Sequence, residues 1–208
     1  MSENRNVHIV VADPSALGLL GLAIVTLVAS TQKLGVTNGT SFIVPWAIFL
    51  GAAAQLIAGA LDFKHNNLFG STVFSAFGLF WLGVAMSWMI KTGVFGAEMA
   101  KMADARQLGY AFLGYFLFAL IGTVVAMEAN FALFIDMVFI DLLLLSLAMD
   151  TLGFGGVWHS LAAWSELIIS IISFYLCAAN FINKSFNRVL VPVGSPLGII
   201  KKGPAAGH

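Results

Sequence analysis

The chain has little charge, a single cysteine and no known catalytic motif, and each shortage excludes a class of protein. Charged residues make up 10% of its 208 residues and hydrophobic residues 60%, whereas a typical soluble domain is about 25% charged and about 45–50% apolar. A soluble domain of this length could not bury so much apolar surface, so we expect lipid to solvate the chain. One cysteine excludes a disulfide framework, and zero net charge gives no basic field for nucleic acid.

Catalytic and cofactor-binding patterns are also missing from the sequence. There is no G-x-S-x-G, H-E-x-x-H or Walker loop and no Cys/His cluster. Of the four histidines, His8 and His208 are terminal, His65 falls in an expected loop, and only His159 falls in an expected helix. Every lysine lies at the edge of an expected span, which excludes a retinal Schiff base. We therefore expect no enzymatic activity, no cofactor and no metal.

Four long windows without Asp, Glu, Lys or Arg predict membrane-spanning helices: 14–32, 35–61, 65–90 and 107–127. Each is about as long as the roughly 20 residues that a helix needs to cross the hydrocarbon core. The stretch 130–181 is long enough for two more spans around a Gly-rich turn at 153–156. The alternating pattern of an outer-membrane barrel is absent. The sequence thus predicts an all-α polytopic membrane protein with six transmembrane helices.

The spans define a short N-terminal segment (1–12), a six-helix transmembrane domain (13–183) and a C-terminal tail (184–208). With six spans, both ends lie on one side of the membrane. That side carries more cations (Arg5, Lys64, Lys184, Arg188, Lys201 and Lys202) than the other (Lys33, Lys91, Lys101 and Arg106). The positive-inside rule therefore favours cytoplasmic termini, in a multi-pass protein of the cell membrane.

Span two carries a row of small and polar residues. Gly51, Gln55 and Gly59 recur every fourth residue and share one helix face, where small residues allow close packing of helices. The amide of Gln55 needs a polar partner in mid-span, so it is either a contact between helices or part of a pore lining. Span three carries an aromatic stripe at i, i+3 and i+7, which is either packing or a gate: Phe74, Phe77 and Trp81.

Four motifs occur in order along the chain and together resemble the acetate uptake transporter family, which includes succinate–acetate permeases. Residues 13–19, DPSALGL, are similar to its N-P-A-P-L-G-L signature. Residues 48–59, IFLGAAAQLIAG, are similar to its F-x-G-x-x-x-Q-x-x-x-G run, and residues 69–81, FGSTVFSAFGLFW, to its F-G-x-T-x-F-x-x-[YF]-G-x-F-W run. FNR at 186–188 and PVG at 192–194 resemble its closing F-G-R…L-P-x-G.

The resemblance implies a carrier or channel for acetate and related short carboxylates, with succinate as a further substrate and protons as the coupling ion. It also implies a homo-hexamer with one substrate path through each protomer. That path narrows at three apolar side chains from spans one, three and five. By motif position these fall on Leu22, Phe77 and Met137, with Gln55 close by as a donor to the substrate.

The sequence departs from the family pattern at several acidic positions. Asp13 replaces the first Asn of the signature, which keeps a helix cap but places a negative charge where an anion would enter the path. Asp136, Asp141 and Glu166 lie outside the pattern, and we expect no cation near them. Such carboxylates tend to be neutral when buried. They lie at subunit contacts or the membrane interface, or one of them couples protons to the substrate.

The two acids of span five cannot serve the same path. They are five residues apart, which separates them by about 140° around a helix. Asp136 neighbours Met137, so we expect Asp136 in the path and Asp141 against another helix or a neighbouring subunit.

Two other functions stay open from the sequence. One is a passive channel for a small neutral solute such as urea, an amide or ammonia, which the acids favour because they would repel an anion if ionised. The other is a structural or sensing membrane protein without a flux of its own.

Overall fold

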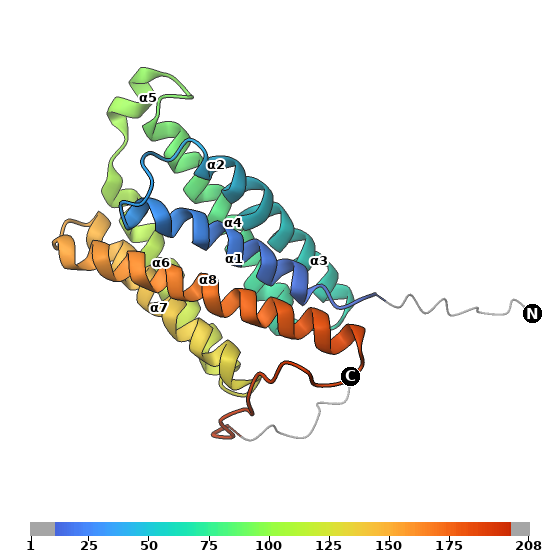
Figure 1. Cartoon of the computed structure of the whole chain (residues 1–208). Helices are drawn as coiled ribbons and strands as arrows, with labels where there is room; N and C mark the ends of the chain where they lie inside the picture. The colour runs from blue at the N-terminus through green and yellow to red at the C-terminus, as the bar shows by residue number, and fades with distance from the viewer. Residues whose placement is uncertain (1–10, 201–208) are drawn as a thin grey trace, which may run out of the picture.

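The computed structural model describes residues 11–200, which form a bundle of long helices (Figure 1). Six helices in this range are long and apolar enough to cross a membrane. They are α1 (Ser15–Lys33), a continuous helix made of α2 (Ile43–Trp46), the π-helical segment η1 (Ala47–Ala54) and α3 (Gln55–Lys64), then α4 (Leu68–Lys91), α6 (Ala105–Ala126), α7 (Phe131–Thr151) and α8 (Gly156–Ser185). The predicted six spans are therefore confirmed.

Polar residues just outside the helices set where several of them begin. The Asp13 carboxylate accepts a hydrogen bond from the Ser15 backbone N–H at 2.8 Å, but Pro14 and not Asp13 occupies the N-cap position of α1, so the prediction of Asp13 as the N-cap is wrong by one residue. Three other side chains accept from the first turns of α4, α6 and α7 in the same way: Asn67, Asp104 and Asn130. Each satisfies a backbone donor that the helix leaves free. The predicted turn between the last two spans contains Gly153 and Gly155, both with positive φ.

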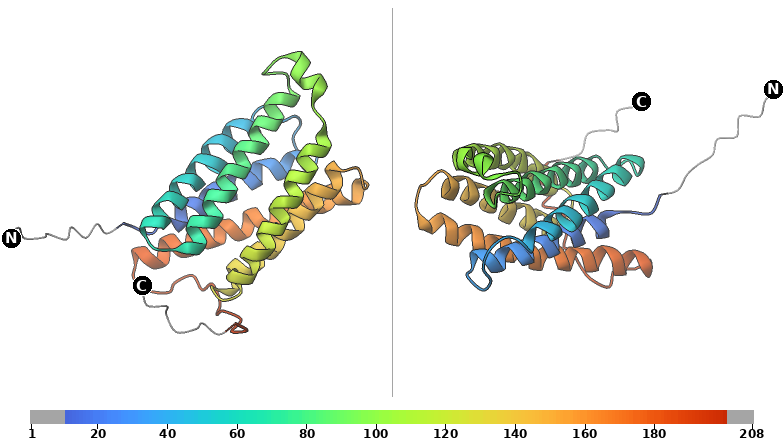
Figure 2. Two further views of the ribbon diagram at one scale, coloured as in Figure 1. Left: turned by 180° about the vertical axis from the view of Figure 1, so that it is seen from behind. Right: turned by 90° about the horizontal axis from the view of Figure 1, so that it is seen from above.

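Helices that are consecutive in the chain pack against each other in two pairs, and the last helix joins them. The helix η1–α3 packs along α4, and α6 packs along α7. α8 closes the bundle by packing along both α1 and α7, so the first and last helices lie side by side (Figures 1 and 2). A short helix, α5 (Ala97–Met102), joins α4 to α6 at the end of the bundle opposite the start of α1.

Glycines bring η1 and α3 close to their neighbours. A Cβ on Gly51 would lie 2.7 Å from the Trp81 side chain, and a Cβ on Gly59 would lie 2.3 Å from Ser75 Oγ. Gly51, Gln55 and Gly59 are all buried, so the shared inward face predicted for them is confirmed. Small residues at this spacing allow helix backbones to pack closely without water between them.

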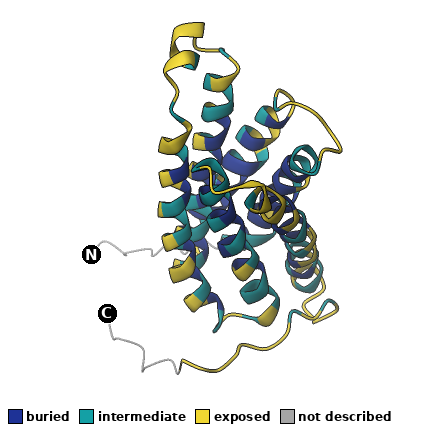
Figure 3. Ribbon diagram, turned by 90° about the vertical axis from the view of Figure 1, so that its left-hand side faces the viewer, coloured by how far each residue is buried: buried dark blue, intermediate teal, exposed yellow. Residues whose placement is uncertain are grey.

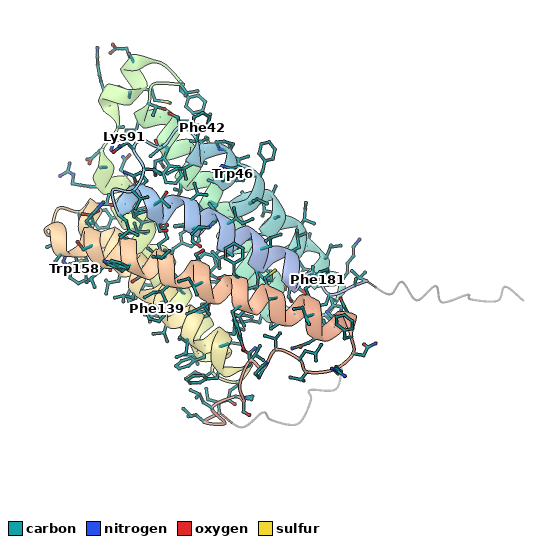
Figure 4. All side chains as sticks on the ribbon, in the orientation of Figure 1. Phe42, Trp46, Lys91, Phe139, Trp158 and Phe181 are labelled. Carbon is teal, nitrogen blue, oxygen red and sulfur yellow. The ribbon has the colours of Figure 1, made fainter. Side chains whose placement is uncertain are left out.

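The burial pattern separates an inner from an outer face on the long helices, whereas the short helix α5 has no buried residue (Figure 3). Large apolar side chains also lie on the outside, where lipid or another protein surface would cover them. Figure 4 labels three that are exposed in the single chain: Phe42, Trp46 and Phe181. Such a surface suits a bilayer, because lipid tails solvate it at no cost.

The segment that follows α8 returns across the end of the bundle. Its backbone bonds to the α6–α7 connection: Ala132 N–H donates to Val193 O at 2.9 Å, and Leu197 N–H donates to Met127 O at 2.8 Å. The Glu128 carboxylate accepts from two further N–H groups, those of Ile199 and Ile200. The predicted termini include residues outside the described range, among them His8, His208, Arg5, Lys201 and Lys202.

Candidate functional site

A small cavity inside the bundle brings together the residues predicted for the substrate path. Its volume is about 40 Å³, more than the roughly 10–15 Å³ that one water needs. Leu22 of α1, Gln55 of α3, Phe77 of α4, and Asp136 and Met137 of α7 all line it. The remaining lining residues are mostly apolar: Leu19, Phe69, Gly70, Val73, Phe74, Leu133 and Ile140. Four helices thus contribute to one site.

Three apolar side chains that the family resemblance predicts for the narrow part of the path lie in the wall of this cavity. Leu22, Phe77 and Met137 are 8%, 5% and 1% exposed. The Phe77 ring is held by other aromatic rings, with centroids 6.2 Å from Tyr115 and 6.0 Å from Phe118. Such packing limits ring motion and fixes the width of the site on the α4 side.

Gln55 is the uncharged polar side chain in the cavity wall. It is 1% exposed, and its Nε2 donates to the Gly51 carbonyl at 2.8 Å, which uses one of the two N–H groups of the amide. Gln55 follows directly after η1, and short π-helical segments often mark functional sites. No sequence pattern predicted this π-helix.

Asp136 is the only ionisable residue among those that line the cavity in the described chain. It is 1% exposed, and its Oδ2 accepts a hydrogen bond from Ser173 Oγ of α8 at 3.0 Å. Its Oδ1 is buried without a partner among residues 11–200. A buried carboxylate oxygen without a partner is costly unless it meets a proton or a polar ligand, and the same holds for Oδ1 of Asp62 and of Asp141.

Asp141 points away from the cavity, as its spacing from Asp136 predicts. Its Oδ2 accepts a hydrogen bond from Thr123 Oγ1 of α6 at 2.7 Å. The carboxylate therefore lies in the contact between α6 and α7, which stabilises the pairing of these two helices.

Glu166 corrects an expectation from the sequence, since the prediction that no cation lies near the acids is wrong for this residue. Lys33 Nζ lies 2.8 Å from Glu166 Oε2, with side chains 13% and 2% exposed. Next to this pair, the ring of His159 lies between the Asp150 carboxylate (3.0 Å) and the Lys33 carbonyl (3.2 Å). The partners are too far apart in sequence for any motif to have linked them.

Asp13 also has a partner that the sequence did not reveal. Its carboxylate forms an ion pair with Lys184 near the end of α8 and accepts a hydrogen bond from the Ser15 N–H. Lys184 therefore offsets the negative charge of Asp13, and the place of Asp13 at the entrance of the path stays a prediction. Asp13 is not among the cavity-lining residues.

Asp62 is a buried acid near the site that sequence reasoning missed. It is fully buried, and Asn67 Nδ2 donates to its Oδ2 at 3.1 Å. A Cβ on the cavity-lining Gly70 would lie 1.9 Å from this Oδ2, so Asp62 packs directly behind the cavity wall. The sequence contained a signal that could have identified it, because Asp62 is the only acidic residue at the C-terminal end of span two.

A larger cleft lies elsewhere in the described chain. It measures about 910 Å³ and opens between α4, α5 and α6, where Trp88, Lys91, Asp104 and Gln107 line it. None of the predicted path residues contributes to it. Within residues 11–200, no group of three or more His, Cys, Asp or Glu side chains could hold a metal ion.

Six membrane-length helices, four of which line a small and mostly apolar cavity with one amide and one carboxyl group, have the architecture expected of a membrane transport protein. The chain belongs to the GPR1/FUN34/yaaH family, whose model matches residues 2–196. The resemblance seen in the motifs is confirmed.

The curated relatives of the chain include transporters with different named substrates. It is 31% identical over 190 residues to the succinate-acetate/proton symporter SatP of Escherichia coli K12. This match covers 88% of this chain and 95% of SatP. It is 32% identical over 187 residues to ammonia transport outward protein 2 of Saccharomyces cerevisiae, covering 86% of this chain and 65% of that one.

A solved structure of the bacterial acetate channel SatP shares the fold, with a TM-score of 0.82 and 25% sequence identity over 89% of this chain and all of that one. The predicted all-α, six-helix membrane fold is therefore confirmed.

Proposed function

We propose that this protein carries acetate and related short carboxylates, including succinate, across the membrane together with protons. It acts by transport and not by catalysis. The observation that carries the proposal is the position of Asp136, a buried carboxyl group in the wall of the cavity where Leu22, Gln55, Phe77 and Met137 meet. The names of the bacterial relatives support the choice of substrate.

Charge balance at Asp136 explains why a proton would accompany the substrate. Two like charges 4 Å apart repel by about 4 kcal/mol at an effective dielectric constant of 20, and no cation lines the described cavity. An ionised Asp136 would therefore exclude an acetate anion. A protonated Asp136 removes this repulsion and offers an O–H donor to the carboxylate. Proton and anion thus enter the cavity together.

The other cavity residues dehydrate the anion and donate a hydrogen bond to it. Leu22, Phe77 and Met137 form an apolar step at which the anion loses its water, and this step limits the rate. The second N–H of the Gln55 amide provides a donor beside the step. This polar contact lowers the cost of dehydration, because a buried charge needs hydrogen bonds.

The test uses Asp136→Asn, which mimics the protonated carboxyl group. In proteoliposomes, Asp136→Asn should keep the exchange of labelled acetate at equal pH but lose accumulation driven by ΔpH. Protein-free vesicles measure passive entry of the neutral acid, and Asp141→Asn is the matched control on the same helix outside the cavity. If Asp136→Asn accumulates acetate as well as the parent does, the proton role of Asp136 is wrong.

A second candidate function is passive passage of ammonia or another small neutral solute. Two observations favour it: yeast relatives carry the name of ammonia transport outward proteins, and the cavity is small. Collapse of ΔpH lowers proton-coupled acetate uptake and leaves the flux of a non-titrating solute such as urea unchanged. Ammonia is followed at equal pH on both sides, because its protonation to ammonium makes its accumulation depend on ΔpH. A structural or sensing protein would show neither flux.

We further propose a homo-hexamer in the cell membrane with cytoplasmic termini. Exposed apolar residues such as Phe42 and Trp46 provide surface for lipid and subunit contacts. Mass measurement in detergent tests the oligomer. Reporter fusions at the two ends test the orientation.

A further inference from the structure

The Lys33–Glu166 ion pair is buried at the contact between the first and last helices. Lys33 is the last residue of α1, and Glu166 lies within α8. Their 2.8 Å contact joins side chains that are 13% and 2% exposed. Lys33 lies at the end of its span, yet both charges are shielded from solvent, and buried charges in a membrane-spanning bundle are costly and commonly mark functional sites. The pair takes no part in the cavity chemistry proposed above.

The register of the two helices places the pair on the same wall of the bundle as the cavity. Lys33 follows Leu22 by eleven residues, which is about 20° past three full turns and about 16 Å along α1. Glu166 precedes Ser173 by seven residues, about 20° short of two turns and about 10 Å along α8. Leu22 lines the cavity, and Ser173 donates to Asp136. The pair therefore lies further along the α1 face that lines the cavity and the α8 face that contacts Asp136.

We infer that Lys33 is a second binding site for the substrate carboxylate and that Glu166 occupies this site as a tethered substitute until substrate and a proton arrive. The proton binds to a carboxylate oxygen of Glu166, and the Lys33–Glu166 ion pair breaks. A new ion pair forms between Lys33 and the carboxylate of the substrate. One cation and one anion are in contact before and after, so the net charge of the site is unchanged. The choice of a short carboxylate as ligand rests on the proposed function.

Buried charge makes the exchange cooperative. If a proton bound alone, the Lys33 ammonium would be left without a partner, which is strongly destabilising in a buried site. If acetate bound alone, two carboxylates would share one ammonium. Proton and anion therefore bind together. The tethered carboxylate of Glu166 competes with acetate for Lys33 at a local concentration of about millimolar or above. Acetate therefore binds Lys33 weakly and dissociates readily, as transport requires.

Two further ionisable groups lie beside the pair. Asp150 approaches from α7, and His159 lies on α8 itself. Both ring nitrogens of His159 contact acceptors, the Asp150 carboxylate and the Lys33 carbonyl. These contacts tie the end of α1 to α7 and α8, so they hold Lys33 in place while its partner changes. A His159→Gln variant separates their contribution from that of Glu166.

The test removes the tethered competitor and asks whether a free carboxylate replaces it. Glu166→Gln keeps the size of the side chain and loses its charge. Thermal unfolding is measured in sodium chloride, in sodium acetate at equal ionic strength, and with acetamide as a neutral analogue of acetate. Glu166→Gln should melt below the parent in chloride, recover in acetate and not respond to acetamide. Its acetate affinity should rise by about tenfold or more, since the tethered carboxylate is gone.

Glu98→Gln is the matched control, because Glu98 makes the same 2.8 Å contact with Lys101 on α5 but both side chains are more than two-thirds exposed. It should behave as the parent in all three solutions. If acetate stabilises Glu166→Gln no more than it stabilises the parent, the inference is overturned.

Proton uptake gives a second and independent measurement. Calorimetric titration of acetate in two buffers of different ionisation enthalpy counts the protons bound with each anion. The parent should take up one proton more per acetate than Glu166→Gln does, and equal uptake would overturn the inference. If Glu166→Gln can be isolated in neither salt, the double variant Lys33→Gln/Glu166→Gln replaces it and should show the same loss of proton uptake.

Failure of this site and failure of the proposed function are distinguishable. A parent that binds acetate with the extra proton but transports none contradicts the function alone. A parent whose acetate transport depends on Asp136, with proton uptake that Glu166→Gln leaves unchanged, contradicts the second site alone.

Discussion

Gly21 allows the closest backbone approach between α1 and the π-helical segment, and Gly21→Ala should disturb both stability and transport. A Cβ at this position would lie 2.3 Å from the carbonyl oxygen of Leu50 and 3.2 Å from the Cβ of Ala54. Neither neighbour is the flexible end of a side chain, so the two helices must move apart by about an ångström. Overpacking of this kind costs about 1–3 kcal/mol.

Gly83→Ala is the control variant that separates the overpacking cost of Gly21→Ala from the general effect of replacing a helical glycine by alanine. A Cβ on Gly83 of α4 meets nothing within 4 Å, and replacing a helical Gly by Ala stabilises by about 0.5–1 kcal/mol. Both variants share this gain, so the difference between them is the overpacking itself. For a chain of this size it corresponds to a Tm difference of about 2–12 °C.

Thermal unfolding in detergent measures this difference, and the five tryptophans of the chain provide the fluorescence signal. Acetate exchange should change as well in Gly21→Ala, because Gly21 precedes the cavity residue Leu22 and η1 leads into Gln55. Equal melting temperatures for Gly21→Ala and Gly83→Ala would refute the close packing on which the cavity geometry depends.

Three further substitutions test the site and its surroundings. Phe77→Ala widens the apolar step, so acetate flux should rise and larger acids should pass; unchanged rates and selectivity with normal expression would remove Phe77 from the path. Gln55→Leu keeps the bulk and deletes the donor, so acetate affinity should fall more than Tm, whereas equal loss of both would indicate a contact between helices. The Arg106 guanidinium holds the pKa of Asp104 at about 2. The ion pair therefore contributes fully to folding stability at any pH above the ordinary pKa of 3.8, and its contribution is lost only as the pH falls towards 2. Asp104→Asn should leave the pH profile of transport between pH 5 and 8 unchanged, and a shifted profile would contradict this reasoning.

The sequence alone determined the number and places of the spans. Charge-free windows and the cost of unpaired backbone groups in lipid leave helices as the only option for segments such as 65–90 and 107–127. The shared face of Gly51, Gln55 and Gly59 also followed from helical spacing. These features are local, because each depends on residues within one or two turns of the same helix.

The path residues Leu22, Phe77 and Met137 were predicted from the resemblance to a family, not from spacing. The structure brings them to one cavity, and their role in transport stays a prediction. The direction of Asp141 followed from geometry, since five residues turn a helix through about 140° from Asp136. Which neighbour it would meet, Thr123 of α6, depended on how the helices pack.

Only the tertiary structure decided the partners of the charges. Lys33 meets Glu166 from the far end of the chain because α8 packs along α1, and Asp13 meets Lys184 for the same reason. No periodicity within a helix specifies such a contact. The contact depends on which of the six apolar helices pack side by side. Close packing at small residues such as Gly21 and Gly51 contributes to this arrangement, and the charges in the sequence do not indicate it. The sequence places these acids within apolar spans, and the fold determines which of them are buried and which are paired.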